Sequence, residues 1–269
     1  MSARSDALIA AGAKHALRAT AILIFAFIVA PLVVIIVGSF SNRLYLTFPP
    51  TDFGLRWYRE LATQARWFDA AWNTVVIGVP VALFSVIFGT ISALAVVRGR
   101  GRSLAFLSPL LLAPMMLPHI IIAIGLYPTI IDLGIVNTYT AVIVGHIVVA
   151  TPIVFIIVTS SLKSYSESLD MAARTLGANE WKVFRRVTFP MIRSGMVVGG
   201  IFAFSISFDE LMLSLFLTSP RTETLPRLIW EHLFYTITPT VAAVSTLILT
   251  ASIVLLVGAM SLGRDALEN

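Results

Sequence analysis

The sequence contains no cysteine, and only 12% of its residues are charged. The lack of cysteine excludes disulfides and thiolate-bound metals, and it removes the usual indicator of the redox compartment. The scarcity of charge argues against a soluble domain, because charged and polar side chains have to cover a protein surface in water. With 58% hydrophobic residues and a mean hydropathy of +0.91, most of this chain is expected to be surrounded by lipid.

Motifs of common nucleotide-binding and hydrolytic sites are also missing. There is no Gly-x-x-x-x-Gly-Lys-Ser/Thr loop, no His-Glu-x-x-His and no Gly-x-Ser-x-Gly. We therefore predict that the chain is not an enzyme and holds no catalytic, cofactor-binding or metal-binding residues. If ATP drives its activity, ATP-Mg is expected on a separate subunit. The chain has no low-complexity tract, flexible linker or internal repeat, so residues 1–269 are predicted to form one transmembrane domain.

Six stretches are apolar over the length of about 20 residues that a helix needs to cross a bilayer. They are Thr20–Phe40, Trp72–Val97, Ser103–Ile131, the central part of Leu133–Leu162, Ser194–Thr218 and Thr240–Leu262. Because backbone in lipid has to satisfy its own hydrogen bonds, these stretches are expected to be α-helices. The third is rich in proline and is expected to be kinked. The sequence therefore predicts an all-α membrane protein with six transmembrane helices.

The basic residues favour one orientation in the membrane. With the N-terminus inside, most of the 19 Lys and Arg residues fall in inner segments. These inner residues are Arg4, Lys14, Arg18, Arg98, Arg100, Arg102, Lys163, Arg174, Lys182, Arg185, Arg186, Arg193 and Arg264. Since cytoplasmic loops are enriched in Lys and Arg, both termini are expected to be cytoplasmic, and the net charge of +5 reflects orientation rather than nucleic-acid binding. The first span lacks a convincing cleavage site and is expected to be retained.

Two outer segments are predicted to be helical. Leu55–Ala71 has an amphipathic pattern, with Trp57, Trp67 and Trp72 nearby, which is typical of a helix at the membrane interface. Leu225–Phe234 is a candidate for a second short surface helix. Each segment could cap the bundle or could provide a docking surface for an external partner. The pattern favours capping, because interfacial tryptophans are common in membrane proteins.

The inner segment Lys163–Arg193 is too long and too regularly patterned to be a simple connector. Ser164 and Glu167 have the spacing of a capping box, which predicts that a helix begins there. The next apolar residues follow the i, i+3, i+4, i+7 pattern of one helix face. They are Leu169, Ala172, Ala173 and Leu176.

The residues after this face predict a sharp corner. Gly177 is suited to a left-handed C-cap, Asn179 can cap a second helix, and Pro190 is expected to end that helix. Such an element could dock in a groove of a cytoplasmic partner and pass the partner's motion to the bundle. Alternatively, it could rest on lipid headgroups through Arg185, Arg186 and Arg193. The pattern alone does not separate these two roles.

A family resemblance favours the first role. The run Met171-Ala172-Ala173-Arg174-Thr175-Leu176-Gly177, then nine residues, then Val187-Thr188-Phe189-Pro190, resembles the EAA motif of ABC-importer permeases. That motif reads Glu-Ala-Ala, three residues, Gly, nine residues, then Ile-x-Leu-Pro. Met171 replaces the glutamate, so a charge contact could have moved to Asp170 or Glu167. The resemblance implies that residues 163–193 form the loop that docks on an ATP-binding subunit. Its coupling residues would be Asp170, Met171, Ala172, Ala173, Gly177 and Pro190.

The same resemblance implies the type I ABC-importer permease fold, a bacterial inner-membrane location and transport by alternating access. It also implies the partners: a second permease subunit, taken to be a different chain, two ATP-binding subunits and a periplasmic solute-binding protein. A further likeness concerns the solute. The stretch Ser207-Phe208-Asp209-Glu210 through Thr218-Ser219-Pro220, then Leu225-Pro226, is similar to the second permease of spermidine/putrescine transporters. It implies a polyamine or related amine, although related permeases carry other small charged solutes.

Asp209 and Glu210 are the only carboxylates inside a predicted apolar span. On a continuous helix from Ser194, Asp209 would lie about 22 Å along the axis, in the outer part of the membrane. Charged groups at such depth often mark a solute pathway, and Phe204 and Phe208 could add cation–π attraction. The alternative is a structural hydrogen-bonding pair between helices or subunits. His119 and His146, in two other spans, are likewise expected to be structural hydrogen bonders.

Two other functional classes compete with the importer permease. A secondary transporter is expected to contain internal repeats and paired broken helices, and only the proline-rich third span is obviously interrupted. A membrane scaffold subunit would use the inner loop to bind something other than an ATPase. Association with an ATPase separates all three hypotheses.

Overall fold

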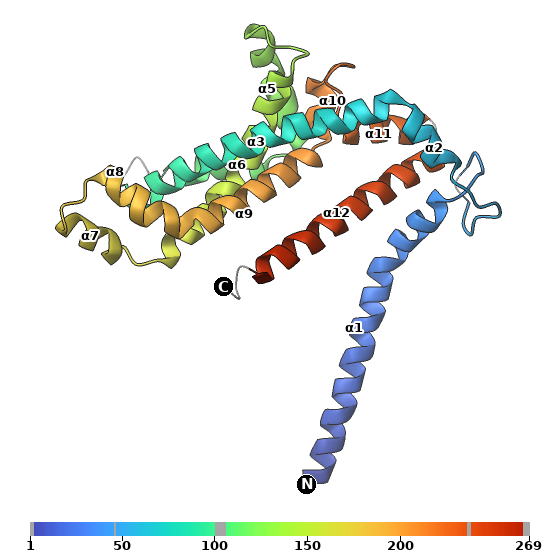
Figure 1. Ribbon diagram of the computed structural model, residues 1–269, viewed down its shortest axis with the longest axis horizontal. Coiled ribbons are helices and arrows are strands. Elements are labelled where there is room, and N and C mark those ends of the chain that lie inside the picture. The colour runs from blue at the N-terminus through green and yellow to red at the C-terminus, as the bar shows by residue number, and fades with distance from the viewer. Residues whose placement is uncertain (1–2, 46, 100–105, 236–237, 266–269) are drawn as a thin grey trace. The chain divides into compact units, whose positions relative to one another are not determined.

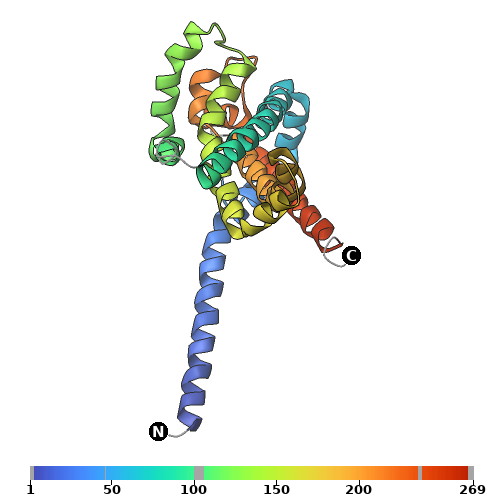
Figure 2. The same cartoon turned by 90° about the vertical axis from the view of Figure 1, so that its left-hand side faces the viewer.

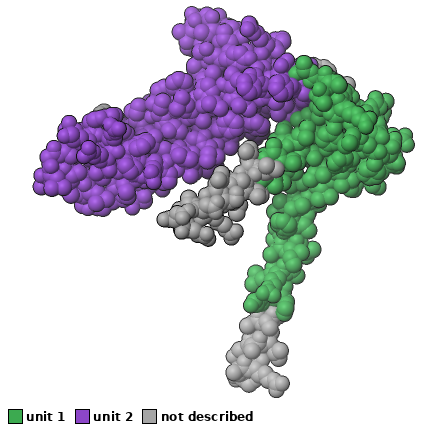
Figure 3. Space-filling view, in the orientation of Figure 1, with its two compact units in different colours: residues 1–65, 231–269 green, residues 66–230 purple. Residues whose placement is uncertain are grey.

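The computed structural model describes residues 3–45, 47–99, 106–235 and 238–265. Nearly all regular structure in these ranges is helical, and one isolated antiparallel bridge joins Ser41 and Phe53 (Figure 1). The chain separates into two compact units, residues 1–65 with 231–269 and residues 66–230 (Figure 3). The larger unit contains the inner segment Lys163–Arg193 and the carboxylate pair Asp209 and Glu210.

The smaller unit contains α1 (Ala3–Ser39), α2 (Arg56–Thr63) and α12 (Pro239–Asp265). α12 contacts both α1 and α2. Large apolar side chains on α1 are exposed, including Phe25 and Phe27, which is typical of a helix that contacts lipid or another subunit. The predicted outer helix Leu55–Ala71 is wrong as a single element, because Gln64 is extended and ends α2 after eight residues.

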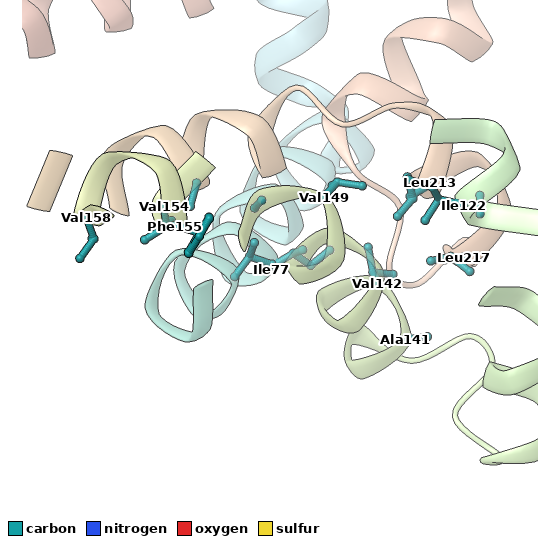
Figure 4. Close-up of a cluster of buried hydrophobic side chains, with 14 of the residues drawn as sticks. Ile77, Ile122, Ala141, Val142, Val149, Val154, Phe155, Val158, Leu213 and Leu217 are labelled. Atoms are coloured by element: carbon teal, nitrogen blue, oxygen red, sulfur yellow. The ribbon is translucent and has the colours of Figure 1, made fainter. Parts of the chain in front are cut away.

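The larger unit is built on three long elements: α3 (Ala65–Arg98), α6 (Tyr139–Ser164) and α9 (Phe189–Phe208). Their buried aliphatic side chains form one cluster with residues of the shorter helices (Figure 4). α6 and α9 approach closely at Gly195, where a Cβ atom would lie 2.0 Å from Ser161 Oγ. Small residues allow such close helix packing in membranes, where van der Waals contact rather than water exclusion holds helices together.

The proline-rich third span is broken rather than gently kinked. α4 (Leu107–Met116) and α5 (His119–Asp132) meet at an angle of 111° across Leu117 and Pro118, and the two green helices in Figure 2 run in different directions. Proline lacks an N–H and forces the preceding residue towards extended backbone, and Leu117 has φ −100° and ψ 140°. The predicted kink is therefore confirmed. The predicted beginning at Ser103 lies outside the described residues.

The fifth predicted span begins and ends earlier than expected. One helical run of 29 residues extends from Glu180 to Phe208, through α8 (Glu180–Val183), a π-helical turn (Phe184–Thr188) and α9. The chain then leaves the helix before α10 (Met212–Leu217). The prediction of a continuous helix over Ser194–Thr218 is therefore wrong.

Pro190 does not end a helix, as the sequence analysis expected, but lies in the first turn of α9. The turn before it is π-helical, and the Phe189 N–H donates to the Phe184 carbonyl. This wider turn changes the hydrogen-bond register immediately before the proline, which has no N–H to contribute. The helix therefore continues through Pro190 into the apolar span.

The predicted count of six spans is met only in part by the described residues. Four helical segments are long and apolar enough to cross a membrane, and the bent α4–α5 pair would provide a fifth crossing. These four are Ala13–Ser39, Ala65–Arg98, Tyr139–Ser164 and Glu180–Phe208. In α12, the apolar stretch Pro239–Ile253 is shorter. The predicted short helix near residues 225–234 is confirmed as α11 (Leu225–Tyr235).

Candidate coupling loop and a polar site at two helix breaks

The loop after α6 contains α7 (Ser168–Thr175), which begins later than the sequence predicted. Ser164 is still part of α6, and its hydroxyl donates to the Ser161 carbonyl at 2.8 Å. Glu167 occupies the N-cap position without a side-chain capping bond. The predicted capping box is therefore wrong, because the preceding helix continues through its first residue.

The corner after α7 forms as predicted. Gly177 has φ +85°, which a residue with a Cβ adopts only with strain. Its N–H donates to the Arg174 carbonyl at 2.9 Å, and the Ala178 N–H donates to the Ala173 carbonyl at 3.0 Å. This pair of bonds is the Schellman arrangement that ends a helix. Asn179 Oδ1 then accepts from the Lys182 N–H at 2.9 Å and caps the next helix.

The outward surface of this corner is apolar. Leu176 is 89% exposed, Trp181 is 65% exposed, and Met171 and Leu169 are also exposed. Ala172 is exposed and Ala173 is half-buried beside them. Exposed apolar patches bounded by polar residues often mark binding surfaces for a partner. The predicted coupling residues Met171, Ala172 and Ala173 therefore lie where another subunit could reach them.

Asp170 lies on the inner side of the same helix and is only 1% exposed. Arg98, the last residue of α3, places Nη2 2.5 Å from Asp170 Oδ2. Thr188, in the π-helical turn, donates to Asp170 Oδ1 at 3.4 Å, and Tyr165 donates to Oδ2 at 3.4 Å. Arg98 Nη1 also donates to Thr188 Oγ1 at 2.7 Å. We call Arg98, Tyr165, Asp170 and Thr188 the Asp170 cluster.

A second polar site lies beside the two helix breaks of the larger unit. It borders a hollow of about 450 Å³ between the start of α5 and the segment that joins α9 to α10. The hollow is lined by His119, Phe202, Ser205, Ile206, Asp209, Glu210, Leu211 and Met212. His119 is the first residue of α5, directly after the bend, and Asp209 directly follows α9. Both interruptions therefore bring polar groups to one place.

Glu210 is the buried member of the carboxylate pair, with 5% exposure. Its Oε2 lies 2.6 Å from His119 Nδ1, and its Oε1 accepts from the Leu213 N–H at 3.0 Å. The Glu210 carbonyl accepts from Ser214 Oγ at 2.7 Å. Ser214 Oγ lies 3.4 Å from His146 Nε2, and His146 Nδ1 lies 2.9 Å from Ser207 Oγ. We call His119, His146, Ser207, Glu210 and Ser214 the Glu210 cluster. Both histidines therefore bond between helices, as predicted.

Asp209 differs from its neighbour because its side chain is exposed at the hollow. It caps the C-terminus of α9 through its own N–H, which donates to the Ser205 carbonyl at 3.1 Å. The two carboxylates are therefore not adjacent positions on one continuous helix.

The aromatic side chain at the hollow is Phe202. Phe204 packs towards Gly78 of α3, where a Cβ atom would lie 2.8 Å from its ring, and its centroid is 6.0 Å from that of Phe208. Neither Phe204 nor Phe208 is among the residues that line the hollow. Among the described residues, no three His, Asp or Glu side chains group as a metal site.

The segment from residue 85 to residue 264 matches the model of the family described as binding-protein-dependent transport system inner membrane component. This segment contains the coupling loop, both clusters and the hollow. The chain belongs to this permease family. It is 30% identical over 243 residues to the spermidine/putrescine transport system permease protein PotC of Escherichia coli, covering 90% of this chain and 91% of PotC. It is also 30% identical over 234 residues to the putrescine transport system permease protein PotI of Escherichia coli, covering 84% and 83%.

The fold of the permease is also found in a solved structure. A bacterial ABC transporter involved in the import of the acidic polysaccharide alginate contains a chain that superposes with a TM-score of 0.73. The match covers 97% of this permease and 98% of that chain at 17% identity. The expected all-α permease of the type I importer fold is therefore confirmed, and so is its role as a permease subunit of an ABC importer. The secondary-transporter and scaffold hypotheses are set aside.

Two contributors to these sites were missed from sequence. Arg98 was counted only as an orientation residue, although its Thr188 contact joins positions 90 residues apart. His119 was expected to bond between helices, but its partner Glu210, 91 residues away, was not identified. The only local signal was that Arg98 is a polar residue at the end of a long apolar stretch and His119 is a polar residue within one, which is true of many residues without a specific partner.

Proposed function

We propose that this permease forms half of the translocation pathway of an importer for a polyamine or related amine, and that it works by alternating access. The observation that carries the substrate class is the similarity to two Escherichia coli permeases named for spermidine and putrescine. The exposed carboxylate of Asp209 at the hollow supports it, since an ammonium group leaving water needs a negative or polar partner.

The coupling loop is the proposed contact with a separate ATP-binding subunit that holds ATP-Mg. The exposed Met171 and Ala172, with the half-buried Ala173 beside them, would enter a groove of that subunit. Gly177 fixes the angle between α7 and the helical run that starts at Glu180. Pro190 lies inside that run, so a displacement of the corner would move α9 as a rigid body.

The remaining partners follow from the same proposal. This chain would provide only half of the pathway, so a second permease subunit, taken to be a different chain, would provide the other half. Two ATP-binding subunits would dock on the two coupling loops, and a periplasmic solute-binding protein would deliver the solute. In this arrangement both termini of the permease are cytoplasmic, in agreement with the distribution of Lys and Arg.

At the hollow, Asp209 is the proposed pathway residue, and Glu210 is the proposed structural residue that holds the break in place. Phe202 provides the apolar and aromatic wall there. The cation–π role of Phe204 and Phe208 stays a prediction. A small zwitterionic solute is the second candidate, because His119, with 40% of its side chain exposed, lines the same hollow as Asp209.

The transport assay that tests this proposal uses the complete transporter in proteoliposomes, with its binding protein outside. Labelled putrescine and spermidine should accumulate when ATP is inside, and vanadate should abolish this uptake. A labelled zwitterionic amino acid serves as the competing solute. Uptake of the zwitterion without either polyamine would contradict the substrate class, whereas a permease that recovers no ATP-binding subunit would contradict the coupling assignment.

Orientation is tested separately with single cysteines, which is simple in a chain without native cysteine. Asn179→Cys in the coupling corner should react with an impermeant maleimide only from the cytoplasmic side. Thr63→Cys at the end of α2 should react only from outside. Reaction of Asn179→Cys from outside would contradict the proposed orientation.

A further inference from the structure

The Asp170 cluster joins three elements that are separated along the chain. Arg98 is the last residue of α3, Asp170 belongs to α7, and Thr188 belongs to the π-helical turn before α9. The connection does not follow the backbone, which leads from α7 through the corner into α9. α7 is therefore connected to the rest of the unit in two ways. The backbone connects it to α9 through Gly177, and the Asp170 side chain connects it to α3 and to the π-helical turn.

The contacts of the Asp170 cluster are of a kind that can persist while α7 moves. The guanidinium of Arg98 contacts Asp170 with one nitrogen and Thr188 with another, so one rigid group holds both limbs of the corner. The Arg98 guanidinium also lies over the Tyr165 ring, 5.4 Å from its centroid. Asp170 and Thr188 are 1% and 0% exposed, so water offers little competition for these contacts.

We propose that the Asp170 cluster is a second coupling link, through which a displacement of α7 is transmitted to α3 as well as to α9. This inference rests on the proposed docking of α7 on an ATP-binding subunit. In it, Asp170 and Arg98 are positioning residues that act between subunits without touching ATP or solute. Met171, Ala172 and Ala173 make contact with the ATPase, while Asp170 on the inner side of α7 pulls on α3.

The decisive quantity is the coupling ratio, defined as labelled solute accumulated per ATP hydrolysed by the complete transporter in proteoliposomes. Asp170→Asn keeps the shape of the side chain and removes its charge. We expect the ratio to fall about fivefold, within the range by which substitutions in such networks change coupling. The double variant Asp170→Asn/Arg98→Gln should fall no further, because both changes open the same link. The ATP-binding subunit recovered per permease should stay unchanged.

A matched control breaks an ion pair at the opposite end of the same helix. Arg66, near the start of α3, holds the buried carboxylate of Glu223 with two nitrogens, at 2.8 and 2.9 Å. Glu223→Gln should lower the amount of transporter recovered without changing the coupling ratio. An equal fall in the ratio for Glu223→Gln and Asp170→Asn would overturn the proposal, and so would a normal ratio in Asp170→Asn.

Rescue by a cross-link distinguishes a mechanical link from a merely stabilising contact. Arg98→Cys/Asp170→Cys in the cysteine-free chain should have a low ratio, and a short bifunctional thiol reagent that bridges the two sulfurs should restore it. A ratio that stays low after complete cross-linking would overturn the second link. If the unmodified transporter neither retains an ATP-binding subunit nor hydrolyses ATP, the proposed docking of α7 is contradicted. That result does not depend on any of the variants.

Discussion

Asp170 and Glu210 are both buried carboxylates of the same unit, yet they are held by different bases. Arg98 holds Asp170 at 2.5 Å, and His119 holds Glu210 at 2.6 Å. Arginine is always charged in proteins and presents a planar fork of donors, and Arg98 uses two of its nitrogens to hold Asp170 and Thr188. His119 contacts Glu210 through one ring nitrogen, and Glu210 also accepts from the Leu213 N–H. The Asp170 pair is therefore the more firmly held of the two.

The two pairs also differ in the elements that they join and in their exposure. The Asp170 cluster joins the end of α3 to α7 and to the π-helical turn before α9, while the Glu210 cluster joins two places where helices are broken. His119 is 40% exposed at the hollow, and Arg98 is 22% exposed. These differences fit the two proposed roles, a fixed link beside the coupling loop and a less firmly held pair at the proposed pathway. The following experiments test this contrast.

Removal of each base should separate the two pairs most clearly. Arg98→Ala leaves the Asp170 carboxylate buried without its counter-charge, which should lower the free energy of unfolding by about 3 kcal/mol. His119→Ala should lower it by only about 1 kcal/mol, because Glu210 keeps its bond from the Leu213 N–H and borders the hollow. SDS titration of the permease in mixed micelles measures both values. Equal losses would remove the distinction between the pairs.

The corner of the coupling loop provides the next largest effect. Gly177→Val places a β-branched residue at φ +85°, with an expected strain of about 2 kcal/mol and a lower coupling ratio. The matched control is Gly125→Val in the middle of α5, where nothing lies within 4 Å of a Cβ atom. Gly125→Val should leave the amount of folded permease unchanged. Unaltered coupling in Gly177→Val would show that the left-handed corner is dispensable.

The two neighbouring carboxylates at the break should respond differently to loss of charge. Asp209→Asn should lower polyamine uptake about tenfold, equivalent to about 1.4 kcal/mol, with the complex recovered in normal amount. Glu210→Gln should mainly reduce the amount of assembled complex, since its carboxylate bonds His119 and the Leu213 N–H. Uptake of labelled putrescine, divided by complex recovered, separates the two outcomes. Normal uptake in Asp209→Asn would remove this residue from the pathway.

The smallest effect is expected from an ion pair on the outer surface of the coupling loop. A side-chain hydrogen bond from Arg174 to Glu180, together with the charge of Glu180, raises the pKa of Arg174 above its ordinary value. Both side chains are solvated, so the pair is screened by water and salt. Glu180→Gln should let that pKa return towards its ordinary value and leave thermal stability unchanged between pH 6 and pH 9. A clear loss of stability would show that surface charges also hold the loop.

The sequence predicted local features better than it predicted contacts. The left-handed Gly177 and the Asn179 cap depend only on residues a few positions away, and both form as expected. The capping box at Ser164 failed because α6 extends two residues beyond Leu162, the end of its predicted apolar stretch, and the spacing of Ser164 and Glu167 contains no information about the preceding helix. The partners of Asp170 and Glu210 could not be identified either, since each lies across the fold and carries no local periodicity.

At the candidate pathway, too, the sequence predicted which residues matter better than it predicted their geometry. Asp209 and Glu210 were correctly singled out as polar groups within an apolar stretch, but their geometry was derived from a continuous helix. The helix ends at Phe208, so Asp209 and Glu210 lie in a non-helical segment. Helical periodicity therefore could not predict that Asp209 is exposed and Glu210 is buried. Ser207 and Ser214, which bond to His146, stabilise the interrupted region in a way that hydropathy does not reveal.

The π-helical turn at Phe184–Thr188 has a consequence for how this loop can change during evolution. A π turn contains one residue more than an α turn, and one residue corresponds to about 100° of rotation about the helix axis. Deletion of a single residue there would restore an ordinary helix and swing everything before it to another side of α9. Thr188 Oγ1, which lies 3.4 Å from Asp170 Oδ1, would then no longer contact it. An insertion or deletion in this turn is therefore expected to disrupt the Asp170 cluster, whereas a substitution that leaves Thr188 in place is not.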